Sequence, residues 1–337
     1  MKSLAIGQKT VTFFKKNKQL TFTLFLFLFF TIWWLNDSPG RSSNYFWGEL
    51  ENVYGLLALW GSICGITIAH KWGGFKTVIG RAIFMFSFGL LAQEFGQLAY
   101  GYYNFFLEIP VPYPSIGDIG FFGSILFYIY GVLLLAKAAG VKVKTKSFLT
   151  KIQSILIPTV ILILGYLFLL QDYQFDWLNP IIIFLDFGVP LGQAIYISIA
   201  ILTYFLSKGV LGGLMKNKIL FVLLALLIQF TADYTFIYQA SRDLWVVGGL
   251  NDYMYLTSYF LMTLAILELN RDKIISLLLP KIKAEKKSYP LQCEDIYAQL
   301  AQKIIQEEGR VIGDISWDLA FKVPGLVVDA NYMLRLT

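Results

Sequence analysis

Six acidic residues occur within apolar segments, where a charged side chain is costly. They lie at similar depth in six different segments and are Glu51, Glu94, Asp118, Asp186, Asp233 and Asp252. A carboxylate in hydrocarbon costs about 2.5–3.5 kcal/mol, so these side chains are expected to face one another, polar partners or a wet cavity. Carboxylates gathered in this way could bind a cation, a cationic small molecule or a lipid headgroup, or they could exchange protons.

Polar side chains accompany these carboxylates at helical spacing. The pairs are three, four or seven residues apart, namely Glu94 with Gln97, Asp186 with Gln193, Gln229 with Asp233, and Asp252 with Tyr255. Residues at these spacings lie on one face of a helix. The sequence therefore predicts an outward-facing pocket of carboxylates and tyrosines, in which these eight residues, with Asp118 and Glu51, bind the ligand.

We expect the three deepest carboxylates to line this pocket, and these are Glu94, Asp186 and Asp233. Asp118, Asp252 and Glu51 are expected at its mouth. An alternative for Asp118 and Asp252 is that each only caps a helix, where a carboxylate accepts hydrogen bonds from free amides and meets the positive end of the helix dipole. The alternative for Glu51 is a position at the surface.

The elements that must position these residues are transmembrane helices. Of the 337 residues, 57% are hydrophobic and only 15% are charged, against about a quarter charged in soluble domains. Apolar runs of about 20 residues can cross the hydrocarbon core, and they predict an all-α polytopic membrane protein with an eight-helix bundle. The predicted spans are residues 20–36, 49–70, 79–105, 117–139, 152–170, 180–206, 218–239 and 252–270.

Lysine and arginine set the predicted orientation. They gather in the N-terminal segment and in residues 71–81, 137–151 and 208–218, which are alternate connections between the spans. The other connections contain only Arg41 and Arg242. Because cytoplasmic loops carry an excess of positive residues, we expect both termini in the cytoplasm and the chain in the inner (plasma) membrane.

The chain divides into four predicted parts. Residues 1–19 form a basic cytoplasmic N-terminus, 20–270 the membrane domain, 271–290 a basic linker and 291–337 a small cytoplasmic α+β segment. In the last part, residues 294–309 carry one apolar helical stripe, residues 315–322 predict a second helix, and 326–336 predict two strands joined by a turn. So short a segment buries little core, and we expect it to be incomplete or to pack on a partner.

Composition argues against several classes of function. The net charge of +6 comes from basic residues between the apolar runs, which fits topology and not a nucleic-acid partner. Cys64 and Cys293 form no disulfide or zinc motif, and His70 is the one histidine. The pattern assigns no catalytic residue, and it leaves any metal or cofactor undetermined.

One motif carries a family resemblance. Residues 112–118 read PYPSIGD and are followed by an aromatic segment, 121–130. This resembles the P-x-P-S-x-x-D-x-x-[FY] segment in multi-helix membrane sensory input regions of bacterial signalling proteins, which precede diguanylate cyclase or histidine kinase domains. Gly117 replaces the usual alanine of that segment. The resemblance implies a sensory role and a cytoplasmic signalling partner or downstream domain.

Three functions compete on this basis. The first is a membrane sensor or receptor that binds its ligand in the pocket and relays binding to the cytoplasmic segment. The second is a cation- or proton-coupled secondary transporter, for which intramembrane carboxylates are suited. The third is an intramembrane enzyme with a carboxylate-bound metal. The lipid bilayer is a partner in all three, and a homodimer is compatible with each.

Overall fold

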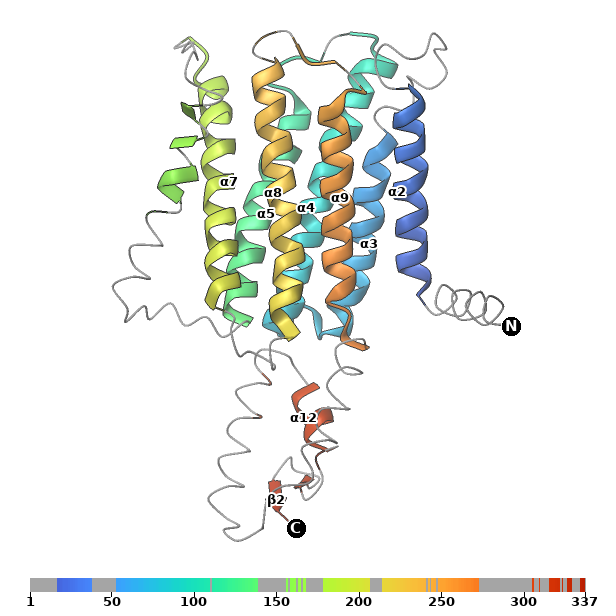
Figure 1. Cartoon of the computed structure of the whole chain (residues 1–337), viewed down its shortest axis with the longest axis vertical. Helices are drawn as coiled ribbons and strands as arrows, with labels where there is room; N and C mark the ends of the chain where they lie inside the picture. The colour runs from blue at the N-terminus through green and yellow to red at the C-terminus, as the bar shows by residue number, and fades with distance from the viewer. Residues whose placement is uncertain are drawn as a thin grey trace, which may run out of the picture.

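The computed structural model describes residues 17–37, 53–109, 111–138, 178–206, 214–240 and 248–272, with parts of 156–167, 242–246 and 305–336. Helices stand side by side in a bundle (Figure 1). Their bounds are α2 Lys18–Asp37, α3 Leu56–Lys71, α4 Val78–Gly101, α5 Ile116–Ala138, α7 Pro180–Leu206, α8 Leu214–Ala240 and α9 Leu250–Glu268. Short helices precede and follow some of them, namely η2 Val53–Gly55, η3 Gly74–Lys76 and the π-helix η4 Tyr102–Phe106.

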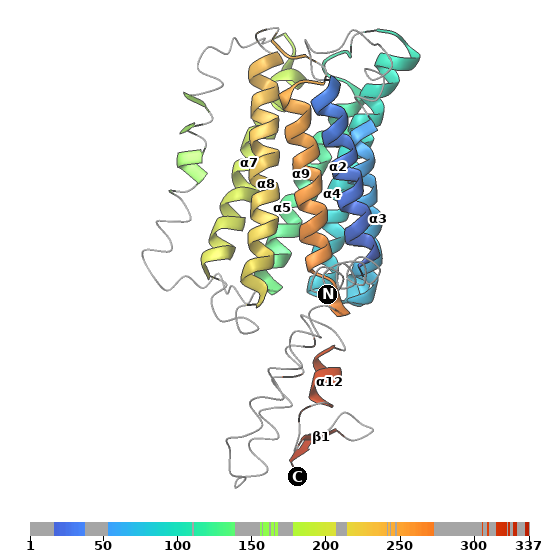
Figure 2. The same cartoon turned by 45° about the vertical axis from the view of Figure 1, so that its right-hand side comes forward.

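Six helical segments in the described part of the chain are long and apolar enough to cross a membrane. They are residues 18–36, 53–71, 78–106, 116–138, 180–205 and 218–239. Each coincides within a few residues with a predicted span. The predicted span 152–170 lies largely outside the described residues. Helix α9 coincides with the last predicted span and runs the height of the bundle beside α8 (Figures 1 and 2).

The distribution of side chains is the reverse of that in a soluble protein. On α5, Ile119, Leu126 and Leu133 recur every seven residues and are 71%, 55% and 47% exposed. In contrast, Gln93 and Gln193 are buried between helices. A continuous apolar exterior is stable only where water is absent, so the outer faces of the helices are suited to lipid.

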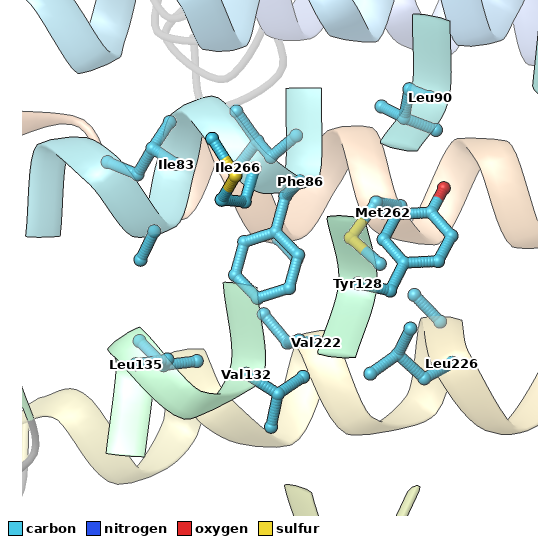
Figure 3. Close-up of a cluster of buried hydrophobic side chains, with 14 of the residues drawn as sticks. Ile83, Phe86, Leu90, Tyr128, Val132, Leu135, Val222, Leu226, Met262 and Ile266 are labelled. Carbon is cyan, nitrogen blue, oxygen red and sulfur yellow. The ribbon is translucent and has the colours of Figure 1, made fainter. Parts of the chain in front are cut away.

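The half of the bundle near Lys71 is closed by an apolar core. Ile83, Phe86 and Leu90 from α4 meet side chains from α5, α8 and α9, which Figure 3 shows in close contact. Those partners are Tyr128, Val132, Leu135, Val222, Leu226, Met262 and Ile266. All ten are at least nine-tenths buried.

Polar contacts mark the two ends of the bundle. At one end Lys71 pairs with Asp272, and Lys218 donates to the Glu268 carbonyl at 2.6 Å and carboxylate at 3.2 Å. At the other end the Trp34 indole donates to the carbonyl oxygen of Gly248 at 3.0 Å. The end that carries Lys71 and Lys218 is therefore the end at which α8 begins and α9 finishes (Figure 1).

The described part of the C-terminal segment contains one short helix and one pair of strands. Helix α12 spans Ile315–Ala320. Strands β1 Leu326–Val328 and β2 Leu334–Leu336 are antiparallel, with Val327 opposite Arg335. The predicted helix over 294–309 lies almost wholly outside the described residues.

Candidate functional site

A cavity of about 90 Å³ lies between the helices at the end of the bundle opposite Lys71. Four carboxylates line it, one each from α5, α7, α8 and α9, and they are Asp118, Asp186, Asp233 and Asp252. The helices are long and parallel, so one residue near the same end of each can reach a common volume. These four are among the six carboxylates to which the sequence pointed.

Each of these four carboxylates accepts a hydrogen bond from a tyrosine that also lines the cavity. On the α5 and α7 side, the Tyr100 hydroxyl donates to Asp118 at 3.3 Å and the Tyr113 hydroxyl donates to Asp186. Asp118 also accepts from the amide and the hydroxyl of Ser115, the residue before α5, at 2.5 and 3.0 Å. Asp118 thus both caps its helix, in the manner of a capping box, and faces the cavity.

The α8 and α9 side repeats the arrangement. The Tyr255 hydroxyl donates to Asp233 at 2.7 Å, and the Tyr54 hydroxyl donates to Asp252 at 3.3 Å. Asp252 also accepts from the Gly248 amide at 2.7 Å. Asp252 therefore faces the cavity and binds the chain just before α9, and the helix has no side-chain cap at its N-cap residue, Gly249.

A layer of amides lies beneath the cavity. Gln193 and Gln229 both donate to Asp233, the latter at 3.1 and 3.2 Å, and Ser258 donates to the Gln229 carbonyl oxygen at 2.8 Å. Both glutamines are almost fully buried and are not among the residues that line the cavity. The sequence predicted that both bind the ligand. In the structure they contact the cavity only through Asp233, whose carboxylate they orient.

Gln97 lines the cavity and joins it to a second group of buried polar residues. Its amide donates to the Tyr259 hydroxyl at 3.3 Å, and that hydroxyl donates to Gln93 at 3.0 Å. Gln93 in turn donates to the Ser124 hydroxyl at 2.7 Å. The polar groups therefore continue from the cavity toward the apolar core and end at Ser124.

Glu94, which was predicted to share the cavity, is not among the residues that line it. Glu94 is 3% exposed, and its carboxylate packs against Gly55 at the start of α3. The reason is the rotation of side chains around the axis of α4. Residues three apart on a helix point in directions that differ by about 60°. Gln97 and Tyr100 therefore face the cavity, while Glu94, one turn deeper, faces α3. Glu51, expected at the mouth, lies outside the described residues.

The charge of the lining is wholly negative among the residues that the structure describes. The lining contains aspartates but no lysine, arginine or histidine. Asp118, Asp233 and Asp252 accept the hydrogen bonds described above from neutral groups. No three His, Cys, Asp or Glu side chains in the described part of the chain converge closely enough to hold a metal ion, so the carboxylates are spread around the cavity.

Most of the other lining residues, among them Tyr54, Tyr100 and Tyr113, were not predicted as ligand contacts. Tyr113 belongs to the PYPSIGD motif, and the motif itself was the available signal. Desolvation and the hydrogen bond to Asp186 raise the pKa of its hydroxyl, so Tyr113 stays protonated as a donor at neutral pH. Asn251 and Trp245 also line the cavity.

The helices and the cavity together define a class. The chain is a multi-pass helical membrane protein with an acidic, tyrosine-rich cavity at one end of its bundle. Comparison with protein-family models, with curated proteins and with solved structures found no match.

Proposed function

We propose that this protein is a membrane receptor that binds a small cation in the aspartate–tyrosine cavity and relays binding to the cytoplasmic segment after α9. One observation carries the proposal: four carboxylates, each held by a tyrosine hydroxyl, line one cavity whose described lining has no basic residue. Negative charges in a site of low dielectric attract a cation strongly.

The aromatic part of the lining supports the same ligand. Phe121, Phe122 and Trp245 stand among the aspartates and tyrosines of the cavity wall. A cation within about 6 Å of an aromatic ring gains about 0.5–2 kcal/mol from the negative ring face. An organic cation uses both the carboxylates and the ring faces.

The proposed topology places the cavity on the outer side of an inner membrane. The bundle end that holds Lys71, Lys76 and Lys218 is rich in positive charge, and positive residues favour the cytoplasm. With α9 and residues 152–170 counted as spans, the chain has eight and both termini are cytoplasmic. An extracellular or periplasmic cation would then reach the cavity without crossing the bilayer.

Helix α9 is the proposed relay. Its first two turns carry Asp252 and Tyr255 in the cavity wall, and its last turn is held through Glu268 by Lys218 of α8. A ligand changes the cytoplasmic end only if it binds two packings of this helix with different affinity. The resemblance of the PYPSIGD motif to sensory input regions favours such a relay to a signalling partner or downstream domain.

The apolar core favours a receptor over a carrier. Below Ser124, the bundle is filled by side chains such as Phe86, Val132 and Leu226 (Figure 3). A carrier must open a polar route through this region, and the described residues there offer no second group of carboxylates.

The test is cation binding by the full chain in lipid nanodiscs. Calorimetric titration with potassium, magnesium, butylammonium and 1,4-diaminobutane should show saturable binding of at least one of these cations. Asp233→Asn and Asp252→Asn should each weaken it by at least tenfold. Asp272→Asn, an exposed carboxylate at the opposite end, is the matched control and should leave binding unchanged.

Two results would contradict the proposal. The first is that none of the four cations binds above the signal of empty nanodiscs. The second is robust uptake of the bound cation into vesicles that contain the protein, especially if deletion of the chain after residue 281 leaves the uptake intact, because this would favour the transporter. In a receptor, hydrogen exchange in residues 305–336 should instead change when the cation binds.

A further inference from the structure

We propose that the natural ligand is a linear diamine, a molecule with a primary ammonium group at each end of a short apolar chain. This inference rests on the proposed function, since it names the class of cation that the cavity takes. Three observations support it that cation binding alone does not require: the number of carboxylates, the apolar part of the cavity wall, and one buried acceptor.

The first observation is the number of carboxylates: four line the cavity, one from each of four helices. Tyr113, which donates to Asp186, is close enough to interact electrostatically with Asp118 as well. On the other side, Tyr255, which donates to Asp233, interacts in the same way with Tyr54, the donor to Asp252. No three acidic groups among the described residues converge on one point. Four carboxylates that do not converge on one point exceed the charge of one ammonium group, and a ligand with two separate ammonium groups matches them better.

The second observation is the apolar wall. Six apolar residues also line the cavity, and they are Phe121, Phe122, Leu185, Val189, Phe236 and Ile237. Small hydrated ions gain nothing from such a wall, whereas methylene groups are stabilised by it. At about 10–15 Å³ for each water-sized group, the cavity of about 90 Å³ has room for roughly six to nine of them. Diaminobutane and diaminopentane have about six and seven non-hydrogen atoms.

The third observation concerns Asn251, which lines the cavity and is 1% exposed. Its amide nitrogen donates to the Ala232 carbonyl at 2.6 Å, which fixes the direction of the side chain. Its carbonyl oxygen is buried and has no hydrogen-bond partner among the described residues. A buried acceptor without a hydrogen bond costs free energy. A ligand that carries an N–H group could donate the missing hydrogen bond.

Asn251 is therefore assigned as the residue that selects a primary ammonium group. A primary ammonium has three N–H donors, enough for carboxylate oxygens of the cavity wall and the Asn251 oxygen together. A quaternary ammonium has the same charge but no N–H, so it can satisfy the carboxylates by charge alone. The two ligand types separate the role of Asn251 from that of the aspartates.

The experiment compares four probes by calorimetric titration of the full chain in nanodiscs. They are 1,4-diaminobutane, 1,5-diaminopentane, 1-aminobutane and 1,4-bis(trimethylammonio)butane. We expect either diamine to bind at least tenfold more tightly than 1-aminobutane, which has one charge, and than the bis-quaternary compound. Asn251→Ala should weaken diamine binding about tenfold and leave bis-quaternary binding unchanged, which also shows that the variant is folded.

The outcomes distinguish this inference from the proposed function. If 1-aminobutane or a metal ion binds as tightly as the diamines, and Asp233→Asn abolishes that binding, the cation receptor stands and the diamine is refuted. If Asn251→Ala weakens all probes equally, or none of them, the assignment of Asn251 is refuted. If no cation binds at all, both proposals fail.

Discussion

Gly120 lies where α5 approaches the backbone of α4, and replacing it with alanine tests the packing that holds Asp118 in the cavity wall. A methyl group on Gly120 would lie 2.5 Å from the Ala92 carbonyl oxygen and 2.8 Å from the Gly96 nitrogen. An unstrained carbon–oxygen contact is about 3.3–3.6 Å, so the methyl group is too close by roughly 0.9 Å. Both atoms belong to the backbone, so the two helices must separate.

Gly123, three residues later on the same helix, is the matched control. A methyl group there meets no atom within 4 Å. Glycine to alanine within a helix gains about 0.5–1 kcal/mol in both variants, whereas overpacking costs about 1–3 kcal/mol in Gly120→Ala alone. The propensity gain cancels between the variants, so Gly120→Ala should be about 1–3 kcal/mol less stable than Gly123→Ala.

The assay is unfolding of each variant in mixed micelles by titration with a denaturing detergent, followed by circular dichroism. Gly123→Ala should equal or exceed the original chain in stability. Gly120→Ala should also weaken cation binding, because separation of α4 and α5 moves Tyr100 away from Asp118. Equal stability of the two variants would refute the close approach of α4 and α5.

Three further predictions use other parts of the molecule. Lys218→Met removes a cation whose side chain is 5% exposed and should lower the free energy of unfolding by about 1–2 kcal/mol. Lys71→Met, in an exposed ion pair, should change the free energy of unfolding by less than about 0.5 kcal/mol. Equal losses in the two variants would contradict this prediction. Because the folded chain holds the Tyr113 proton more tightly than the unfolded chain, stability should fall as the pH rises above about 10, and less steeply in Tyr113→Phe. Fusion of a phosphatase that is active only outside the cytoplasm should give activity after Glu108 and none after Lys76, and the reverse result would invert the proposed topology.

The sequence by itself was enough to predict the membrane class and the approximate bounds of the spans. Both depend on the cost of placing polar backbone and side chains in hydrocarbon, which is a property of each segment alone. The same cost made Asp186 and Asp233 stand out as residues that must find polar surroundings. For those two the prediction of a shared cavity agrees with the lining.

Tertiary structure decided which polar residue faces which neighbour. Glu94 has the depth of a cavity residue, but the rotation of α4 turns it toward Gly55, and no pattern within one helix sets that rotation. The partnerships of Tyr113 with Asp186 and of Asn251 with Ala232 join segments 73 and 19 residues apart. Hydrogen-bond partners between helices depend on how the helices pack, and packing is set by side-chain shape across the whole bundle.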